Sequence, residues 1–324
     1  MKNLKPLLLA LTLGTITIAT TQAAEPTTIQ APKQVAGYYH HQMGNTQITA
    51  LLDGTNYLNP SMFKGISDSE KSDILKKYAA KNDKGVQTSV NAFLINTGKQ
   101  LLMVDSGAAS CFGAHLGSIY NNLKASGYKP TQVNDIFLTH LHPDHVCGIS
   151  YNGVAHYPNA TLHISKIEYD FWLNPNTVKK LPKDKQAGFL STVEKIKAAL
   201  APYEKAKKVK VFSDKSLALG GIEFKPSFGH TPGHYSFKLK VADQEVVFIG
   251  DIVHSHSLQF DKPETAIEFD VDHKAAVQTR LKHFAEYAKQ GQTIAAPHLP
   301  FPGIGHIYSQ DGKSYQWMPI HFKD

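Results

Sequence analysis

Short apolar runs separated by polar turns predict a series of strands along the chain. Residues 90–96 and 101–104 are largely apolar, as is typical of strands that are buried on both faces. Thr97 and Gly98 lie between these runs and predict a hairpin turn. Further strands are expected at residues 47–52, 135–138, 209–212, 235–241, 245–249 and 293–296.

Apolar residues recur at helical spacing in several segments between the expected strands. In residues 69–81, Ile74, Leu75 and Tyr78 share one face of a helix. Glycine commonly ends a helix, and it follows two other segments of this kind. Helices are expected at residues 69–81, 113–126, 166–205 (with a break near 174–183) and 273–290. Strands and helices thus occur in two similar batches, which predicts a layered α/β fold with helices outside two packed sheets.

The first residues have the pattern of a secretory signal peptide. Lys2 and Lys5 precede an uncharged apolar run at residues 7–21, and the small residue Ala23 follows it. An uncleaved membrane anchor is the alternative, but the run is shorter than the roughly 20 residues that span a bilayer. We expect a signal peptide at residues 1–23, a flexible leader at 24–36 and one domain at 37–324. The mature protein is then periplasmic or secreted, without stable membrane insertion.

Composition narrows the range of function classes. The chain has 324 residues, of which 42% are hydrophobic and 19% charged, so it is neither disordered nor fibrous. Its formal net charge is +7, and the loss of Lys2 and Lys5 with the signal peptide leaves +5. The basic residues are dispersed, and Arg280 is the only arginine. Because nucleic-acid recognition depends heavily on arginine, a nucleic-acid partner is not expected.

Cys111 and Cys147 are the only 2 cysteines. In an oxidising compartment they can form a disulfide, and a free buried thiol is the alternative, because the sequence does not give the distance between them.

The densest group of candidate metal ligands lies directly after the strand expected at residues 135–138. His140, His142, Asp144 and His145 fall within six residues there. Zinc prefers such nitrogen and oxygen ligands, and this many in one loop can serve two ions. The alternative is that these histidines form a surface cluster or a hydrogen-bonded core network. Their spacing directly after a buried strand favours metal ligands over this alternative.

Three more candidate ligands lie in later loops. His230 precedes an expected strand, and Asp251 and His298 each follow the end of one. Layered α/β folds build their sites at such sheet edges, so these three residues complete a seven-ligand set with the first group.

Together with residues 102–107, these motifs resemble the metallo-β-lactamase superfamily over nearly the whole mature chain. The resemblance implies an αβ/βα sandwich of four layers and two divalent metal ions, with zinc expected, at one edge of the two sheets. Asp251 would bridge the metals, and Asp105 would orient a ligand without binding metal. In the family pattern, one metal is held by His140, His142 and His230, and the other by Asp144, His145 and His298.

Residues 37–39, 170–173 and 298–307 are similar to the branch of methyl parathion hydrolases and lactonase-like dinuclear zinc hydrolases. This similarity implies a small-molecule substrate, a homodimer and an aromatic substrate pocket, whose positions here are Phe112, Trp172 and Phe189. For the latter two, ordinary core packing is the alternative.

Two departures from that branch are visible. Cys147 stands where the branch has glycine, so it is a disulfide partner, a buried thiol or an accessory metal ligand. His254 and His256 stand where the branch is more apolar, which leaves the specificity for organophosphates open.

The resemblance implies an exported dinuclear hydrolase in which a metal-bridging hydroxide attacks a carbonyl or phosphoryl centre. Asp144 and Asp251 are the expected catalytic carboxylates, since each tempers the charge of the metals and can assist proton movement. The expected substrates are lactones, aryl esters and organophosphate triesters. A β-lactamase, which generally lacks a carboxylate at the position of Asp251, a glyoxalase II and a non-catalytic zinc-binding protein are the alternatives.

Overall fold

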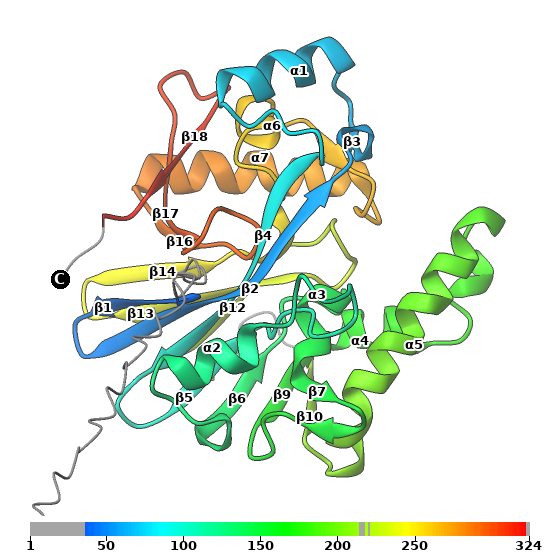
Figure 1. The fold of residues 1–324 in the computed structure, drawn as a ribbon, viewed down its shortest axis with the longest axis vertical. Coiled ribbons are helices and arrows are strands. Elements are labelled where there is room, and N and C mark those ends of the chain that lie inside the picture. Colours follow the sequence, from blue (N-terminus) through cyan, green and yellow to red (C-terminus); the bar gives the residue numbers. More distant parts are fainter. Residues whose placement is uncertain (1–35, 214–217, 220, 322–324) are drawn as a thin grey trace, which may run out of the picture. The chain divides into compact units, whose positions relative to one another are not determined.

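Two β-sheets of seven strands each form the centre of the structure (Figure 1). The structure is a computed structural model, and it describes residues 36–213, 218–219 and 221–321. The signal peptide expected at residues 1–23 and the leader, apart from Ala36, lie outside the described residues. Within the described part of the chain, no helix is long and apolar enough to cross a membrane.

The first sheet is built from residues 38–212, and its second half is parallel. β5, β6, β9 and β10 run parallel to one another, and the remaining neighbours pair antiparallel. In spatial order the strands are β1 (Tyr38–Met43), β2 (Thr46–Leu58), β4 (Val86–Asn96), β5 (Leu101–Val104), β6 (Val133–Phe137), β9 (Thr161–Ser165) and β10 (Val209–Phe212).

The second sheet is mostly antiparallel, with β14 and β16 as its parallel neighbours. In spatial order its strands are β11 (Ala218–Leu219), β12 (Ile222–Pro226), β13 (Tyr235–Val241), β14 (Gln244–Phe248), β16 (Thr293–Ala295), β17 (Ile304–Tyr308) and β18 (Gln316–Pro319). Two small ribbons pair β3 (Phe63–Lys64) with β15 (Ala266–Ile267), and β7 (Ser150–Tyr151) with β8 (Val154–Ala155).

Helices lie on the outer side of each sheet (Figure 1). Beside the first sheet are α2 (Ile119–Ala125), α3 (Pro143–Val146), α4 (Lys166–Leu173) and α5 (Lys183–Lys205). Beside the second are α1 (Asp68–Lys77), α6 (Leu258–Asp261) and α7 (His273–Gln290). The layers therefore run helix, sheet, sheet, helix, and the expected αβ/βα sandwich is confirmed.

The residues of β5 show why its sequence is continuously apolar. Leu101 and Met103 pack in the core under the outer helices, whereas Leu102 and Val104 pack in the core between the two sheets. Successive side chains of a strand point to opposite faces, and here both faces are buried. Each fully buried side chain of this size contributes about 1.5–3 kcal/mol to the free energy of unfolding.

Most expected elements are present, but one helix is shorter than its prediction. The segment expected to be helical at residues 113–126 forms α2 only from Ile119 onward. Gly113 and Gly117 have φ angles of 96° and 98°, which a right-handed helix excludes. Residues 113–118 are therefore a loop, and this part of the prediction is wrong.

The strand directions explain how distant loops meet at one edge. β5 and β6 are parallel, so the segments that follow Val104 and Phe137 leave the first sheet at the same edge. β12, β14 and β16 share one direction in the second sheet, because β13 is antiparallel to both β12 and β14. The loops that follow these strands carry the candidate ligands.

Candidate metal centre

The structure brings all seven sequence-predicted ligands together. Their donor atoms form overlapping groups in which all atoms lie within 4.8 Å of one another. The residues come from the loop after β6 and the start of α3 (His140, His142, Asp144 and His145), the loop between β12 and β13 (His230), the turn after β14 (Asp251) and the loop after β16 (His298).

The first site consists of three imidazoles and one carboxylate. The Nδ1 atom of His142 lies 3.0 Å from Nε2 of His140 and 2.9 Å from Nε2 of His230. The Oδ2 atom of Asp251 lies 3.6 Å from the His140 nitrogen and 3.2 Å from the His230 nitrogen. Burial lowers the pKa of His140 well below its ordinary value, which favours the neutral imidazole that a metal requires.

The second site consists of Asp144, His145 and His298. The Oδ2 atom of Asp144 lies 3.7 Å from Nε2 of His145 and 3.5 Å from Nε2 of His298. Asp251 reaches this group as well, with Oδ1 3.1 Å from His145 Nε2 and Oδ2 3.1 Å from His298 Nε2. Asp251 therefore lies between the two sites, where a bridging ligand would be.

Two buried polar atoms support the fit of this donor set to metal ions. The Nε2 atom of His145 and the Oδ1 atom of Asp251 are buried 3.1 Å from each other, and neither has a hydrogen bond of suitable geometry. An unpaired buried polar atom is costly, and a cation between the two would satisfy both. Imidazole nitrogens and carboxylate oxygens are ligands that zinc and similar divalent ions accept. The residues present thus fit a pair of divalent metal ions.

Asp105 orients a candidate ligand. Its Oδ2 atom lies 2.9 Å from Nδ1 of His145, so the other ring nitrogen points to the second site. Its Oδ1 atom accepts from the backbone N–H of Thr139 at 2.8 Å. This arrangement matches the role that the family resemblance implies for Asp105, since a carboxylate on the far nitrogen holds a ligand ring in place.

Asp270 holds His230 in the same way, although no motif in the sequence marks this residue. Its Oδ1 atom lies 2.9 Å from Nδ1 of His230, and Arg280 approaches its Oδ2 atom at 3.9 Å. Burial lowers the pKa of His230, but the carboxylates of Asp251 and Asp270 outweigh burial and raise it to about 9. The single arginine of the chain therefore supports the site from behind.

His234 is another supporting residue that the sequence left without a role. Its Nε2 atom accepts the backbone N–H of Asp251 at 2.9 Å, while Nδ1 lies 2.8 Å from the hydroxyl of Ser227. Burial lowers the pKa of His234 to about 3, so the ring is neutral and can accept this bond. A side chain at Gly250 would collide with the same ring, since its Cβ would lie 2.4 Å from Nε2. This close approach explains the glycine before Asp251.

His254, whose role the sequence left open, lies at the edge of the metal sites. Its Nε2 atom is 3.1 Å from Oδ2 of Asp251, and its ring stacks on that of His298 at 5.0 Å. Asp251, His254 and His298 form a third group whose geometry suits a metal ion. The geometry therefore makes His254 an eighth candidate ligand, beside the seven that the sequence predicted.

A cavity of about 250 Å³ opens onto the metal sites. Asp144, Asp251 and His254 face it, and its apolar lining consists of Leu58, Val90, Phe112, Leu116 and Phe269.

Two of the three residues expected to form an aromatic substrate pocket do not line this cavity. Trp172 is 5% exposed, its Nε1 atom donates to Glu168, and its ring stacks on Phe189 at 4.9 Å. Trp172 belongs to the core under the outer helices of the first sheet, and the partly buried Phe189 packs against that core. Phe112 lines the cavity, so its role in a substrate pocket stays a prediction, whereas Trp172 and Phe189 have the alternative role of core packing.

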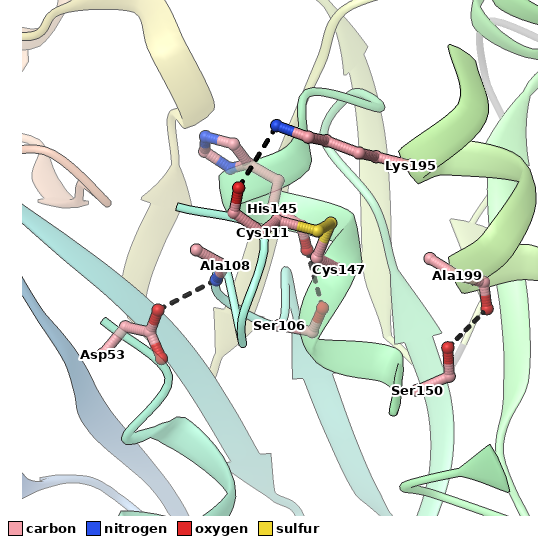
Figure 2. Close-up of a disulfide and its surroundings, with 9 residues drawn as sticks. All are labelled: Asp53, Ser106, Ala108, Cys111, His145, Cys147, Ser150, Lys195 and Ala199. Carbon is pink, nitrogen blue, oxygen red and sulfur yellow. Dashed lines mark hydrogen bonds between the residues drawn. A yellow bond between two sulfur atoms is a disulfide. The ribbon is translucent and has the colours of Figure 1, made fainter. Parts of the chain in front are cut away.

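The two cysteines form a disulfide beside the second site (Figure 2). Cys147 therefore has no free thiolate for a metal. The bond attaches the loop that carries Phe112 to the segment directly after α3. Lys195 on α5 adds to this attachment, because its Nζ atom donates to the carbonyl of Cys111 at 3.2 Å (Figure 2).

Comparison with known proteins identifies similar chains. The sequence model of the Metallo-beta-lactamase superfamily matches residues 85–285. The crystal structure of hydrolase AbOPH, described as in the beta lactamase superfamily, is 63% identical, covers 90% of this chain and 100% of its own, and has a TM-score of 0.89. AidC, a dizinc quorum-quenching lactonase solved in complex with a product, is 26% identical, with coverage of 89% and 99% and a TM-score of 0.79.

A more distant structure shares the fold. A probable metal-dependent hydrolase from Staphylococcus aureus is 19% identical, with coverage of 87% and 100% and a TM-score of 0.68. A comparison with curated protein sequences finds no match.

Proposed function

Because the chain belongs to the metallo-β-lactamase superfamily and is a metal-dependent hydrolase, we propose that it cleaves small ester-like substrates. Lactones and aryl esters are the first candidates, and organophosphate triesters are the next. The observation that carries the proposal is the position of Asp251, which lies between two donor groups and faces a largely apolar cavity.

The donor set supports a dinuclear centre, for which zinc is the expected metal. When bound, two divalent cations supply Lewis acidity and lower the pKa of a coordinated water toward neutrality. The chain contributes the imidazoles, which lose their proton when they bind an ion, and the carboxylates that temper the charge of the ions. Asp144 and Asp251 face the cavity, so a carboxylate oxygen of either residue can accept a proton from an attacking water.

The cavity lining supports an apolar substrate with a small polar reacting group. Leu58, Val90 and Leu116 form an aliphatic surface, and Phe112 and Phe269 are partly exposed at 41% and 38%. Such a surface favours an acyl chain or an aryl ring, while the ester group faces the metal sites. Similarity to AidC, a lactonase, also supports the lactone.

A panel of four substrates tests the proposal. Metal content per chain is measured on the purified protein, which is then assayed with an N-acyl homoserine lactone, dihydrocoumarin, methyl paraoxon and nitrocefin. We expect two metals per chain and turnover of a lactone or aryl ester that is lost after chelation. Two metals with turnover of nitrocefin alone would identify a β-lactamase instead. Two metals without turnover of any substrate would favour a zinc-binding protein.

We also propose that the protein is exported and acts in the periplasm or outside the cell, with residues 1–23 removed. The basic and apolar pattern of the first residues supports this proposal, and a disulfide is typical of an oxidising compartment. Expression in a bacterial host, fractionation and N-terminal sequencing test it. A cytoplasmic protein that begins at Met1 would contradict export. Homodimer formation is part of the same proposal and is tested by light scattering.

A further inference from the structure

Glu168 is a fully buried carboxylate at the start of α4, outside the set of candidate ligands. Four donors surround its two oxygen atoms. Oε1 accepts the backbone N–H of Leu141 at 3.0 Å and the indole N–H of Trp172 at 2.7 Å. Oε2 accepts the hydroxyl of Thr231 at 2.6 Å and the backbone N–H of Gly233 at 3.1 Å.

Each oxygen serves one of the two loops that form the first site. Leu141, which donates to Oε1, lies between the ligands His140 and His142. Thr231, which donates to Oε2, directly follows the ligand His230. One carboxylate therefore joins two loops that lie about ninety residues apart in the chain and end at the same metal site.

Two further contacts tie Glu168 to the site. The indole of Trp172, which Oε1 holds, lies against the ring of His142 with its centroid at 5.4 Å. The backbone of Gly233 packs so closely on α4 that a Cβ there would lie 2.1 Å from the nitrogen of Glu168. Close packing therefore adds to the hydrogen bonds in fixing the positions of the loops that carry His142 and His230.

The four donors around residue 168 require a carboxylate at this position, because another polar side chain would not accept from all of them. In the described part of the chain, Glu168 forms no ion pair, and all four of its hydrogen-bond partners are donors. An ionised carboxylate accepts from all four, whereas an amide or a protonated acid would turn one donor toward another. Burial raises the pKa of Glu168, and the four hydrogen bonds oppose that shift. A buried charge without an ion-pair partner is costly to retain, which points to a role beyond packing.

We propose that Glu168 is a positioning residue that sets the spacing of the two histidine loops and thereby the metal affinity of the first site. The inference rests on the dinuclear centre of the proposed function. It predicts that loss of the carboxylate weakens the first site selectively. Asp144, His145 and His298 have no hydrogen bond to Glu168, so the second site keeps its affinity.

The test measures both metal affinities in the full-length mature protein. Metal-free wild type and the Glu168→Gln variant are titrated with zinc against a chromophoric chelator, and circular dichroism confirms that the protein is folded. We expect one of the two zinc equivalents to bind about 10- to 100-fold more weakly in Glu168→Gln, with the other unchanged. The His298→Ala variant retains the first site, and there Glu168→Gln should weaken the binding of the remaining zinc equivalent. The His230→Ala variant retains the second site, and there Glu168→Gln should leave the remaining affinity unchanged.

Matched variants separate positioning from general stability. Glu204→Gln alters an exposed carboxylate that accepts from Tyr169 of α4, and it should change neither affinity. Thr231→Val removes one donor to Glu168 and should weaken the first site, whereas Thr231→Ser keeps the hydroxyl and should restore it. These two variants also serve if Glu168→Gln fails to fold. Unchanged zinc affinities in the folded variants, or an equal loss at both sites, would overturn the inference.

The test of the role of Glu168 and the test of the proposed function can fail independently of each other. If wild type binds two zinc ions and hydrolyses none of the four substrates, the proposed function fails while the role of Glu168 is still decided by the titration. If wild type hydrolyses a lactone and Glu168→Gln keeps both affinities, only the inference about Glu168 fails.

Discussion

The Asp251 carboxylate reaches both groups of candidate ligands with its two oxygen atoms. Its Oδ2 atom lies 3.2 Å from the His230 nitrogen, and its Oδ1 atom lies 3.1 Å from the His145 nitrogen. Burial raises the pKa of Asp251, but the surrounding imidazoles, His145 foremost, outweigh burial and lower it well below its ordinary value. The carboxylate is therefore ionised, as a metal ligand must be.

We predict that Asp251→Ala abolishes most of the activity while the fold is retained. The variant removes a negative ligand from both metal sites, so we expect turnover to fall by at least about 100-fold and the metal content to fall below two per chain. Steady-state kinetics, elemental analysis and circular dichroism measure these effects. The exposed carboxylate in Asp243→Asn serves as the control. Unchanged turnover in Asp251→Ala would refute the bridging role.

A second prediction concerns Asp270, which orients His230 from behind. In Asp270→Asn the side chain can no longer offer two acceptor oxygens to His230 Nδ1 and to the backbone N–H of Ile267. We expect a loss of about 10- to 100-fold in metal affinity or in kcat/KM, as for other residues that orient metal ligands. Metal titration and kinetics on the same preparation measure it. Wild-type affinity together with wild-type kcat/KM would show that His230 needs no such partner.

The candidate ligands and their supporting residues differ in how well the sequence marks them. His140, His142, Asp144 and His145 are adjacent in the chain, so their proximity in space follows from local geometry alone. Asp270 lies 40 residues from the histidine that it orients. Since carboxylates occur throughout the chain, no spacing marks this one. It is identified only by the packing of its segment on the His230 loop, where the Val271 N–H donates to the His230 carbonyl.

Among the secondary-structure elements, the first half of the loop between β5 and α2 is attached at two points. The backbone N–H of Ala108 donates to Asp53 at 2.9 Å, and the disulfide joins Cys111 to Cys147 (Figure 2). Phe112 lies next to this bond and lines the cavity. The loop is thus a wall of the cavity that is covalently attached to the segment after the candidate ligands His140–His145.

We predict that a Cys111→Ala, Cys147→Ala double variant lowers the free energy of unfolding by about 2–4 kcal/mol, because the bond closes a loop with a sequence separation of 36. We also expect KM to rise, with metal content unchanged, as the wall that carries Phe112 loosens. Urea denaturation and kinetics measure the two effects, and wild type under reducing conditions should behave in the same way. Equal stability of the two proteins would contradict the prediction.

Another element-level contact joins α1 to the segment after α6. Glu70, which caps α1 together with Ser67, also pairs with Lys262. The hydrogen bond from Lys262 is the main cause that lowers the pKa of Glu70 from 4.5 to about 2. Because the folded-state pKa lies below the unfolded value, this carboxylate stabilises the fold above about pH 5 and loses that effect as the pH falls toward 2.

We therefore predict that the stability difference between wild type and Glu70→Gln is constant from neutral pH to about pH 5 and shrinks below it. Urea denaturation at low ionic strength, at several pH values, measures this difference. Protonation of other groups affects both proteins and cancels. In a Lys262→Met background the pH dependence of the difference should flatten. A difference that grows as the pH falls would contradict the assignment.

At the level of the whole molecule, the metal sites connect the two sheets. His145 follows a strand of the first sheet, whereas Asp251 and His298 follow strands of the second. The complete ligand set therefore exists only when the two sheets are packed together. Metal binding is then coupled to the folded state.

We predict that chelation lowers the thermal unfolding midpoint and that added zinc restores it. At free metal about 1,000-fold above Kd, one bound ion stabilises the folded state by about 4 kcal/mol, so the midpoint should shift by several degrees. Calorimetry of the chelated, zinc-loaded and magnesium-treated protein measures the shift. Equal midpoints for the chelated and zinc-loaded forms would show that zinc does not bind these residues.

Local patterns in the sequence predicted the parts of the protein that depend on neighbours in the chain. The bounds of β5, β10, β13 and α7 agree with their predictions, because apolar runs and helical spacing report burial directly. The motif at His140–His145 and the later ligands also follow from residues at strand ends. The two similar batches of strands and helices along the chain also predicted the two packed sheets.

The contacts between distant segments depend on how the sheets and helices pack. The pairing of Cys111 with Cys147, the inward position of Trp172 and the contacts of Glu168 with two loops are examples. Composition singles out the two cysteines but does not give the distance between them, and no spacing marks Trp172 or Glu168. Each interaction requires two segments to approach within a few ångströms, and that approach is determined by the packing of the complete core.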